Sequence, residues 1–272
     1  MITTGIPLSI TYARIATFNK INQNQLGNSL VSLASGKRIR QPQDGPSEFF
    51  RAQRLSRDSN DYTRIKNDVA KASALMDVVS DAGEMVFNGI DRMKQLVNLY
   101  YDESTDDDQK RAMQAEFSSL VKQVSHVVNN SYYDNKLIIS DSSANPLDSV
   151  NIDPNDINNR IVISFSADQV ANVDGLKLGT SREADMKAVQ KELDKAGSYM
   201  ASASAYSIGL NAQYAIAEKK VNISNNVKES ITGADGGQEM IRATNRSIQH
   251  QSSYAMMAQA NMIRTSVMRL FE

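Results

Sequence analysis

His126 and His250 are the two histidines of the chain, and they lie far apart in the sequence. Histidine is the side chain that most readily moves protons or binds metals near neutral pH. Two separated histidines do not assemble a Ser-His-Asp set or a His-based metal cluster. The chain has no Cys, which excludes thiolate chemistry and a disulfide framework. We therefore expect no enzyme, no metal and no cofactor, with His126 on a helix surface and His250 a candidate for a hydrogen bond at an interface.

Two acidic clusters and one glycine cluster could also carry chemistry. Asp106-Asp107-Asp108 is spaced as a helix cap, because no further carboxylates follow at metal-binding intervals. The turn at residues 153–156 lacks the glycine and the terminal glutamate of a calcium loop. The segment 233–237 is rich in glycine but lacks the Gly-Lys-Ser/Thr that cradles phosphate, so we interpret it as a hinge.

The composition narrows the classes of partner. The 272 residues include 30 Lys and Arg against 31 Asp and Glu, a formal charge of −1, which gives no reason to expect a nucleic acid partner. No apolar run is long enough to enter a membrane, and no cleaved signal peptide is visible. The 13 Gly and 5 Pro are few for this length and favour long helices.

These residues must be positioned by helices, of which the clearest extends from Pro46 to Glu103. Apolar residues recur there in alternating steps of three and four, with Gly83 as the exception, which is typical of a coiled-coil seam. The series is Tyr62, Ile65, Val69, Ala72, Met76, Val79, Gly83, Val86, Ile90, Met93, Val97 and Tyr100. A helix of this length would measure roughly 87 Å at 1.5 Å per residue. A compact globule of this size is about 50 Å across, so we expect a rod.

The other elements complete a mainly α fold. Similar stripes predict helices from about Asp107 to Val128, from Ser181 to Ile231, and from the glycine-rich hinge toward Phe271. Between residues 132 and 180, short β-type runs alternate with turn-forming residues. The expected architecture is an elongated rod of long antiparallel coiled-coil helices, with a small β-hairpin region at one end.

The two ends of the chain are amphipathic but almost uncharged. The first 36 residues hold Arg14 and Lys20 and no acidic residue, while Arg246 is the sole charged residue from 243 to 263. Such faces either pack only within their own chain or are buried against further copies, as charge-depleted interfaces are. The apolar candidates for such an interface are Ile15, Phe18, Leu26, Leu30, Leu33, Met256, Ala260, Ile263, Val267 and Leu270.

Several motifs in this order resemble bacterial flagellins. Leu33-Ala34-Ser35-Gly36-Lys37-Arg38-Ile39 is similar to the family's N-terminal Leu-Ser-Ser-Gly-x-Arg-Ile run, and residues 92–97 are similar to its Arg-x-Arg-Glu-Leu segment. The ending from Ser253 to Asn261, followed by residues 267–271, resembles the flagellin Met-Leu-Ala-Gln-Ala-Asn…Val-Leu-x-Leu-Leu pattern. Residues 41–46 depart from the family pattern and are similar to those of hook–filament junction proteins.

The resemblance implies a secreted subunit of the extracellular flagellar filament, in a minimal form without large outer domains. Residues 1–40 and 238–272 would pair as terminal helices lining an inner tube, ordering on assembly, and residues 41–237 would form the helical rod domain. The implied partners are further copies of the chain, the flagellar export apparatus, an export chaperone and the filament cap. Arg92, Leu96 and Glu116 match positions at which some flagellins contact a Toll-like innate receptor.

Two alternatives stay open at this point. A junction adaptor of the same superfamily would have the same fold but would not polymerise by itself. A free-standing coiled-coil binding module would form a small discrete oligomer. If the flagellin resemblance holds, removal of residues 1–36 or 243–272 is expected to abolish polymerisation and leave the rod helical.

Overall fold

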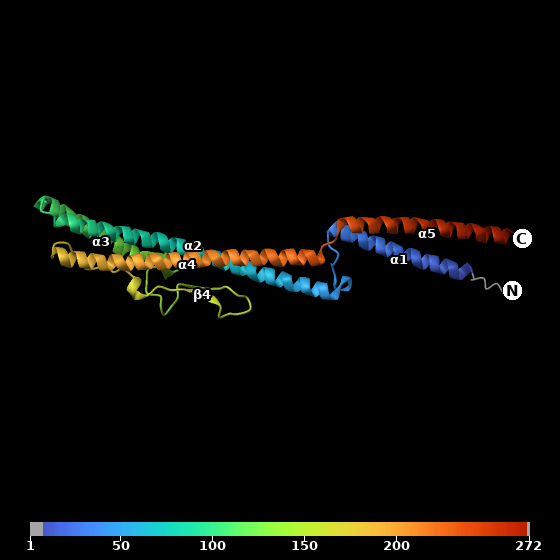
Figure 1. The fold of residues 1–272 in the computed structure, drawn as a ribbon, viewed down its shortest axis with the longest axis horizontal. Helices are drawn as coiled ribbons and strands as arrows, with labels where there is room; N and C mark the ends of the chain where they lie inside the picture. Colours follow the sequence, from blue (N-terminus) through green and yellow to red (C-terminus); the bar gives the residue numbers. More distant parts are fainter. Residues whose placement is uncertain (1–7, 271–272) are drawn as a thin grey trace. The chain divides into compact units, whose positions relative to one another are not determined.

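The computed structural model describes the backbone of residues 8–270 and the side chains of residues 13–259, 261 and 262. Five long α-helices dominate the described chain (Figure 1). They are α1 (Leu8–Ser35), α2 (Pro46–Tyr100), α3 (Asp107–Asn130), α4 (Arg182–Thr232) and α5 (Gly236–Leu270), with 3₁₀ turns η1 (Pro42–Asp44) and η2 (Ala167–Gln169). The mainly α prediction is confirmed.

The chain divides into two units. The first unit comprises residues 1–57 and 224–272, and the second comprises residues 58–223. We expected the division at residues 40 and 238, whereas these boundaries fall inside α2 and α4. Each unit is described by itself below.

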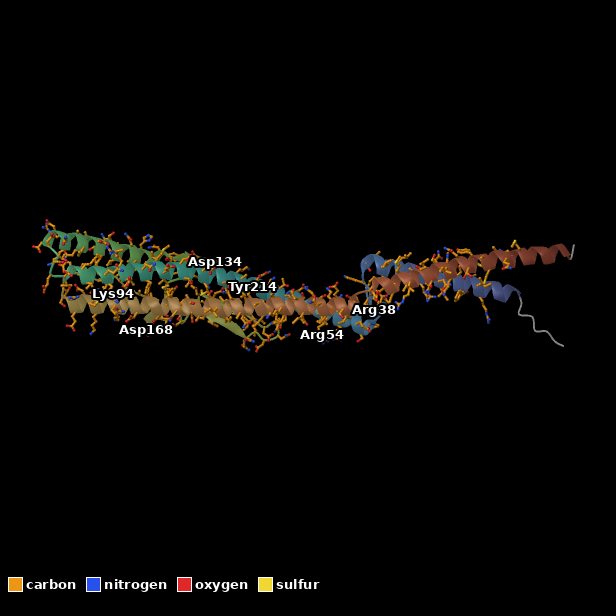
Figure 2. All side chains as sticks on the ribbon, turned by 45° about the horizontal axis from the view of Figure 1, so that its top comes forward. Arg38, Arg54, Lys94, Asp134, Asp168 and Tyr214 are labelled. Atoms are coloured by element: carbon orange, nitrogen blue, oxygen red, sulfur yellow. The ribbon has the colours of Figure 1, made fainter. Side chains whose placement is uncertain are left out.

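The second unit is a bundle in which α3 and α4 both run antiparallel to α2. Its core contains the predicted α2 stripe, including Val69, Met76, Val79, Ile90 and Met93, each fully buried. The α4 stripe covers it, and Tyr214 of α4, labelled in Figure 2, is half-buried and receives Lys66 of α2 over its ring at 5.6 Å. The coiled-coil seam predicted from the 3-4 spacing is therefore the contact between these two helices.

Glycines set the spacing in the core. Gly83, the exception in the α2 stripe, lies where a Cβ would come within 3.2 Å of the Tyr199 ring on α4. Gly89 lies against Val124 of α3, so closely that a Cβ there would overlap a methyl group of that valine. Small residues at these points let the three helices approach.

The α2–α3 connection is capped as its sequence predicts. Asp106 accepts the backbone N–H of Gln109 at 2.7 Å, and the Gln109 side chain accepts the backbone N–H of Asp106 at 3.2 Å. This capping box satisfies N–H groups that the first turn of α3 leaves free. The aspartate cluster therefore starts α3.

The segment between α3 and α4 forms two short antiparallel hairpins. Strand β1 (Tyr132–Tyr133) pairs with β2 (Lys136–Leu137), and β3 (Asp148–Asn151) pairs with β4 (Arg160–Ile163). Asp134 and Asn135 make the first turn with positive φ, a conformation that Asp and Asn tolerate.

The hairpin segment packs on the middle of α4. Tyr199 donates its hydroxyl to the Ile138 carbonyl at 2.9 Å, and its ring contacts that of Phe165 at 4.3 Å. Tyr206 donates to the Ser164 carbonyl at 3.0 Å. We expected a β cap at one end of the helices, and the location differs because these two tyrosines lie on central turns of α4.

Candidate assembly site

Helices α1 and α5 of the first unit form an antiparallel pair, shown in Figure 1. Helix α1 ends at Ser35 and is followed by Gly36, whose φ of 66° is a conformation that favours glycine just after a helix C-terminus. Helix α5 starts after Asp235, whose carboxylate accepts the N–H groups of Gly237 and Gln238 at 2.9 and 3.1 Å. The glycine-rich hinge therefore joins the end of α4 at Thr232 to this N-cap of α5.

The connections that lead into this pair are tied to each other. Lys37 and Gly233 form an isolated antiparallel bridge. The N–H of Arg38 donates to the Thr232 carbonyl at 2.7 Å, and the N–H of Ala234 donates to the Gly36 carbonyl at 2.9 Å. The end of α1 and the start of α5 are thereby held side by side.

The contact between α1 and α5 is polar. Asn19, Asn22 and Ser32 of α1 are 8%, 0% and 7% exposed, and Ser253 of α5 is 6% exposed. These four residues are called the polar seam below. Short polar side chains let the two backbones approach, and Cα atoms of the two helices come within 8 Å of each other.

Hydrogen bonding in this contact is incomplete among the described side chains. Asn22 Oδ1 accepts from Arg246 at 3.4 Å. Asn19 Oδ1, Asn22 Nδ2 and His250 Nε2 are buried without a hydrogen-bond partner. A buried polar group left in this state costs about 1–3 kcal/mol, so the pair is poorly stabilised by its own contact.

Apolar side chains of the pair are also exposed to solvent. Of the predicted interface residues, Phe18, Leu30 and Leu33 are 53%, 50% and 40% exposed. Met256 is 54% exposed. Ile15 and Leu26 are half-buried. The predicted α1 residues thus divide between two faces of the helix. The side chains of Ala260, Ile263, Val267 and Leu270 lie outside the described residues.

The outer surface is larger than the sequence suggested. It also contains exposed apolar residues that the stripe did not include, namely Ile21, Val31, Met240, Ile241, Ile248 and Tyr254. Together with Phe18, Leu30, Leu33 and Met256 they are called the outer apolar face below. The signal for it was the lack of charge in these segments rather than a helical stripe.

Arg92, Leu96 and Glu116 occupy different environments in the second unit. Arg92 Nε donates to Glu116 Oε1 at 2.8 Å, joining α2 to α3, and the two side chains are 45% and 44% exposed. Leu96 is 1% exposed and belongs to the core. The structure thus brings Arg92 and Glu116 together on the surface, and these two are the members of the trio available to a partner.

The described residues contain neither a candidate metal site nor a candidate membrane span. No group of three or more His, Cys, Asp or Glu is placed to hold a metal ion there. Within the same part of the chain, no helix combines the length and apolar character required to cross a membrane. His126 is exposed on α3, and the His250 ring packs edge-on against Tyr254 at 4.7 Å.

Exposed apolar side chains of this kind mark surfaces that bind a partner, and in a structural subunit that partner is a further copy of the chain. Comparison with known proteins places this chain more closely. Residues 8–144 match the N-terminal helical region of bacterial flagellin, and residues 186–271 match its C-terminal helical region.

Two relatives agree with this match. The flagellin of Listeria innocua serovar 6a is 26% identical to this chain, over 88% of this chain and 90% of the relative. The flagellin of Listeria monocytogenes serovar 1/2a shows the same identity and coverage. The chain belongs to the bacterial flagellin family, a family of structural proteins, and is a structural subunit of the extracellular flagellar filament.

Proposed function

We propose that copies of this chain polymerise through the outer apolar face of α1 and α5. The observation that carries the proposal is the inverted polarity of the pair, with amides in the seam and apolar residues outside. A helix pair that was complete by itself would place its apolar residues in the contact. Burying a Phe, Leu or Met side chain contributes about 1.5–3 kcal/mol, so a neighbouring copy that covers this face stabilises the pair.

The proposal assigns separate roles to the parts of the chain. Residues 1–40 with 238–272 act as the assembly segment that lines the inner tube. Residues 41–237 form the surrounding helical shell. Family membership supports export of the subunit by the flagellar secretion apparatus with a chaperone, and addition beneath a filament cap.

The second role that we propose is binding of a Toll-like innate receptor. Arg92 and Glu116 present an exposed ion pair, and Leu96 of the same helix as Arg92 is buried in the core. Loss of receptor binding in Arg92→Ala and Glu116→Ala, with an unchanged circular dichroism spectrum, would support this contact. Identical null signals from the wild type and both variants would contradict it.

The polymerisation proposal is tested by making the outer face polar. Phe18→Ser with Leu30→Ser replaces two side chains that are 53% and 50% exposed. We expect the variant to stay helical and to lose filaments in sedimentation and electron microscopy. Ile157→Ser, at a residue 71% exposed in the β3–β4 hairpin of the second unit, is the matched control and should polymerise normally.

Four outcomes would distinguish the candidates. Filaments from the control but not from the double variant support the proposal, and normal filaments from the double variant contradict it. A wild type that polymerises only on an added hook or cap would favour a junction adaptor. A discrete small oligomer would favour a coiled-coil binding module.

A further inference from the structure

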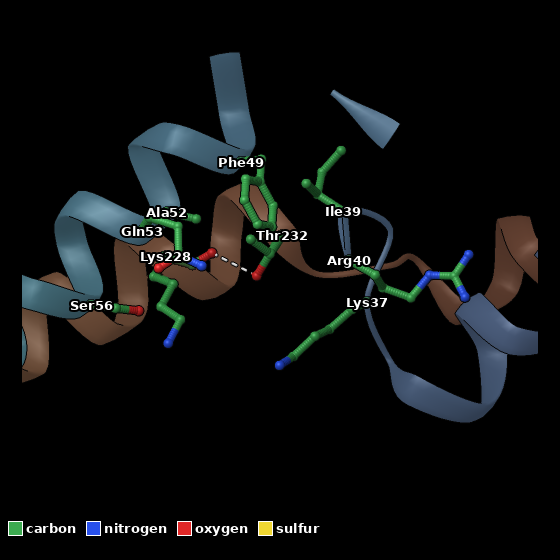
Figure 3. Close-up of a pocket in the computed structure, with 9 residues that line it drawn as sticks. All are labelled: Lys37, Ile39, Arg40, Phe49, Ala52, Gln53, Ser56, Lys228 and Thr232. Carbon is green, nitrogen blue, oxygen red and sulfur yellow. Dashed lines mark hydrogen bonds between the residues drawn. The ribbon is translucent and has the colours of Figure 1, made fainter. Parts of the chain in front are cut away.

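A basic pocket lies in the first unit where the connections meet the start of α2. It has a volume of about 370 Å³ and is lined by Lys37, Lys228, Phe49, Ile39 and Thr232 among others. Figure 3 shows the ammonium groups of Lys37 and Lys228 extending along the same side of the pocket, below the Phe49 ring. Ile39, which also lines the pocket, is 3% exposed.

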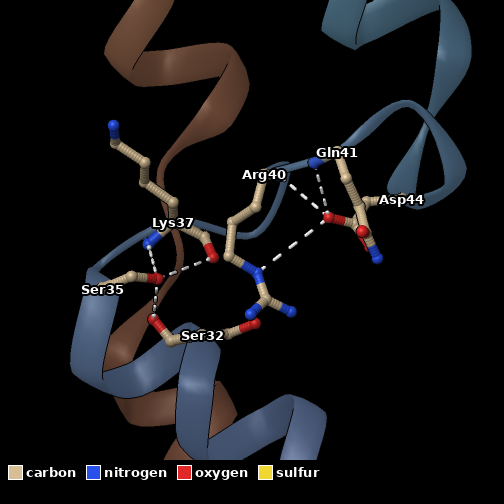
Figure 4. Close-up of polar contacts among 6 residues, drawn as sticks. All are labelled: Ser32, Ser35, Lys37, Arg40, Gln41 and Asp44. Carbon is tan, nitrogen blue, oxygen red and sulfur yellow. Dashed lines mark hydrogen bonds and ion pairs between the residues drawn. The ribbon is translucent and has the colours of Figure 1, made fainter.

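The cations of this pocket are not neutralised within the described residues. Neither Lys37 nor Lys228 takes part in an ion pair there. Arg40 turns its guanidinium away from the pocket, and its Nε lies 4.0 Å from the Asp44 carboxylate (Figures 3 and 4). Arg51, Arg54 and Arg57 follow on α2 and add positive charge to the same segment.

Asp44 is not free to neutralise the lysines. Its Oδ2 accepts the backbone N–H groups of Arg40 and Gln41 at 2.9 and 3.0 Å (Figure 4). These bonds hold the pKa of the Asp44 carboxyl below its ordinary value, the Arg40 bond having the largest effect. Glu48 and Glu229 are close in sequence but do not line the pocket. None of the residues that line the pocket is acidic.

The α2–α3 loop of the second unit carries the opposite charge. Asp102, Glu103, Asp106, Asp107 and Asp108 are all exposed. Asp106 caps α3 and Asp108 pairs with Arg111, but the Glu103 and Asp107 carboxylates have no partner among the described residues. Glu103 in the loop and Asp107 in the first turn of α3 thus present two anions that are close together in the sequence.

We propose that the acidic α2–α3 loop of one copy docks in the basic pocket of the next copy in the filament. This inference rests on the proposed polymerisation. The pocket lies at the first turns of α2, and the loop follows its last turn. Each copy therefore has the pocket near the start of this helix and the loop at its end. A heterologous contact of this kind, repeated from copy to copy, builds an open helical polymer, and its complementary charges fix the register.

The test uses charge reversal in the full-length chain. The pocket variant is Lys37→Glu with Lys228→Glu, and the loop variant is Glu103→Lys with Asp107→Lys. Each variant alone sets like charges against each other, and we expect its critical concentration for polymerisation to rise about tenfold, equivalent to 1.4 kcal/mol. A chain that carries all four substitutions should polymerise at about the wild-type concentration.

Mixing the two variants identifies a contact between copies. In an equimolar mixture each reversed loop meets a reversed pocket on the other variant, so filaments should return in which the two alternate. A contact within one chain would not be restored by mixing. Asp77→Lys with Glu84→Lys, both exposed on α2, is the control for the loop variant and should leave polymerisation unchanged.

The outcomes separate this inference from the function on which it rests. A wild type that forms no filaments would contradict the proposed function and this contact together. If the wild type polymerises, then either normal filaments from both variants or no recovery on mixing would overturn the loop-to-pocket contact alone. Circular dichroism of each variant verifies that α3 is intact.

Discussion

Gly89 determines how closely α3 packs on α2. A Cβ there would overlap Val124, and Val124 is itself 3% exposed and fixed in the core. Gly89→Ala should destabilise the second unit, because overpacking costs about 1–3 kcal/mol and Ala regains only about 1 kcal/mol of helix propensity. Unfolding in urea, followed by circular dichroism, measures the change.

A matched glycine supplies the control for that substitution. Gly209 of α4 has open space where a Cβ would be built, so Gly209→Ala should stabilise the chain by up to about 1 kcal/mol. Val124→Ala removes the methyl groups that a Cβ at position 89 would overlap. In a Val124→Ala chain, Gly89→Ala should therefore cost less stability than it does in the wild type. If Gly89→Ala and Gly209→Ala changed the free energy of unfolding equally, α2 and α3 would not be in close contact at Gly89.

Tyr101 gives the second unit a dependence on alkaline pH. Burial, and next the hydrogen bond to Asp185 at 2.8 Å, raise the pKa of Tyr101 to about 12. Because the pKa is higher in the folded chain than in the unfolded chain, folding favours the neutral hydroxyl. Its contribution to the free energy of unfolding is complete below pH 10 and is lost as pH rises toward 12. Tyr101→Phe should cost about 1–3 kcal/mol at pH 8, and this difference should shrink between pH 10 and 12.

An exposed tyrosine provides the comparison. Tyr132 is 60% exposed. Tyr132→Phe should therefore leave the free energy of unfolding in urea unchanged, both at pH 8 and between pH 10 and 12. A Tyr101→Phe chain as stable as the wild type at pH 8, or a gap that widens above pH 10, would contradict the role of this hydrogen bond.

At the scale of the element, the unusual feature is the polar seam between α1 and α5. Replacing Asn19 and Asn22 by Leu should stabilise the unassembled pair, because two buried amides with unsatisfied atoms become apolar. We expect a gain of about 1–3 kcal/mol in unfolding of the terminal helices. Asn24→Leu, at an exposed position of α1, is the control. A less stable Asn19→Leu, Asn22→Leu chain would show that the amides hold the pair together.

The long helices were predictable because their apolar spacing is regular. The predicted α2 helix began at Pro46 as observed, and it ends at Tyr100 rather than near Glu103. One stripe was found, but α2 has a second seam at intervals of seven, formed by Leu75, Ala82, Gly89 and Leu96. Small residues at two of the four positions hid this seam from a search for large apolar side chains.

Other features could not be predicted because their signals are weak or misleading. Strand β3 has the sequence Asp148-Ser149-Val150-Asn151, which carries one apolar residue and is defined by its pairing with β4. In α1, the 4-3 spacing of the face toward α5 runs through Ile15, Asn19, Asn22, Leu26 and Ser29. Two of these residues are amides, so an apolar stripe does not mark this face. The apolar residues predicted for α1 therefore combine buried and exposed positions.

At the scale of the whole molecule, the subunit has one self-sufficient unit and one that is not. The second unit has a continuous apolar core, whereas the pair formed by α1 and α5 leaves its apolar surface outside. Removal of residues 1–36 or 243–272 should therefore abolish filaments while circular dichroism still reports a helical second unit. Normal filaments from either truncated chain would be incompatible with assembly through these helices.

The most direct measurement is a cryo-electron microscopy map of the polymer formed by the purified full-length chain. We predict a helical tube in which α1 and α5 of adjacent copies cover one another's outer apolar face. A chain that stays a lone, ordered particle at high concentration, or a filament whose maps leave Phe18 and Leu30 facing solvent, would contradict the account.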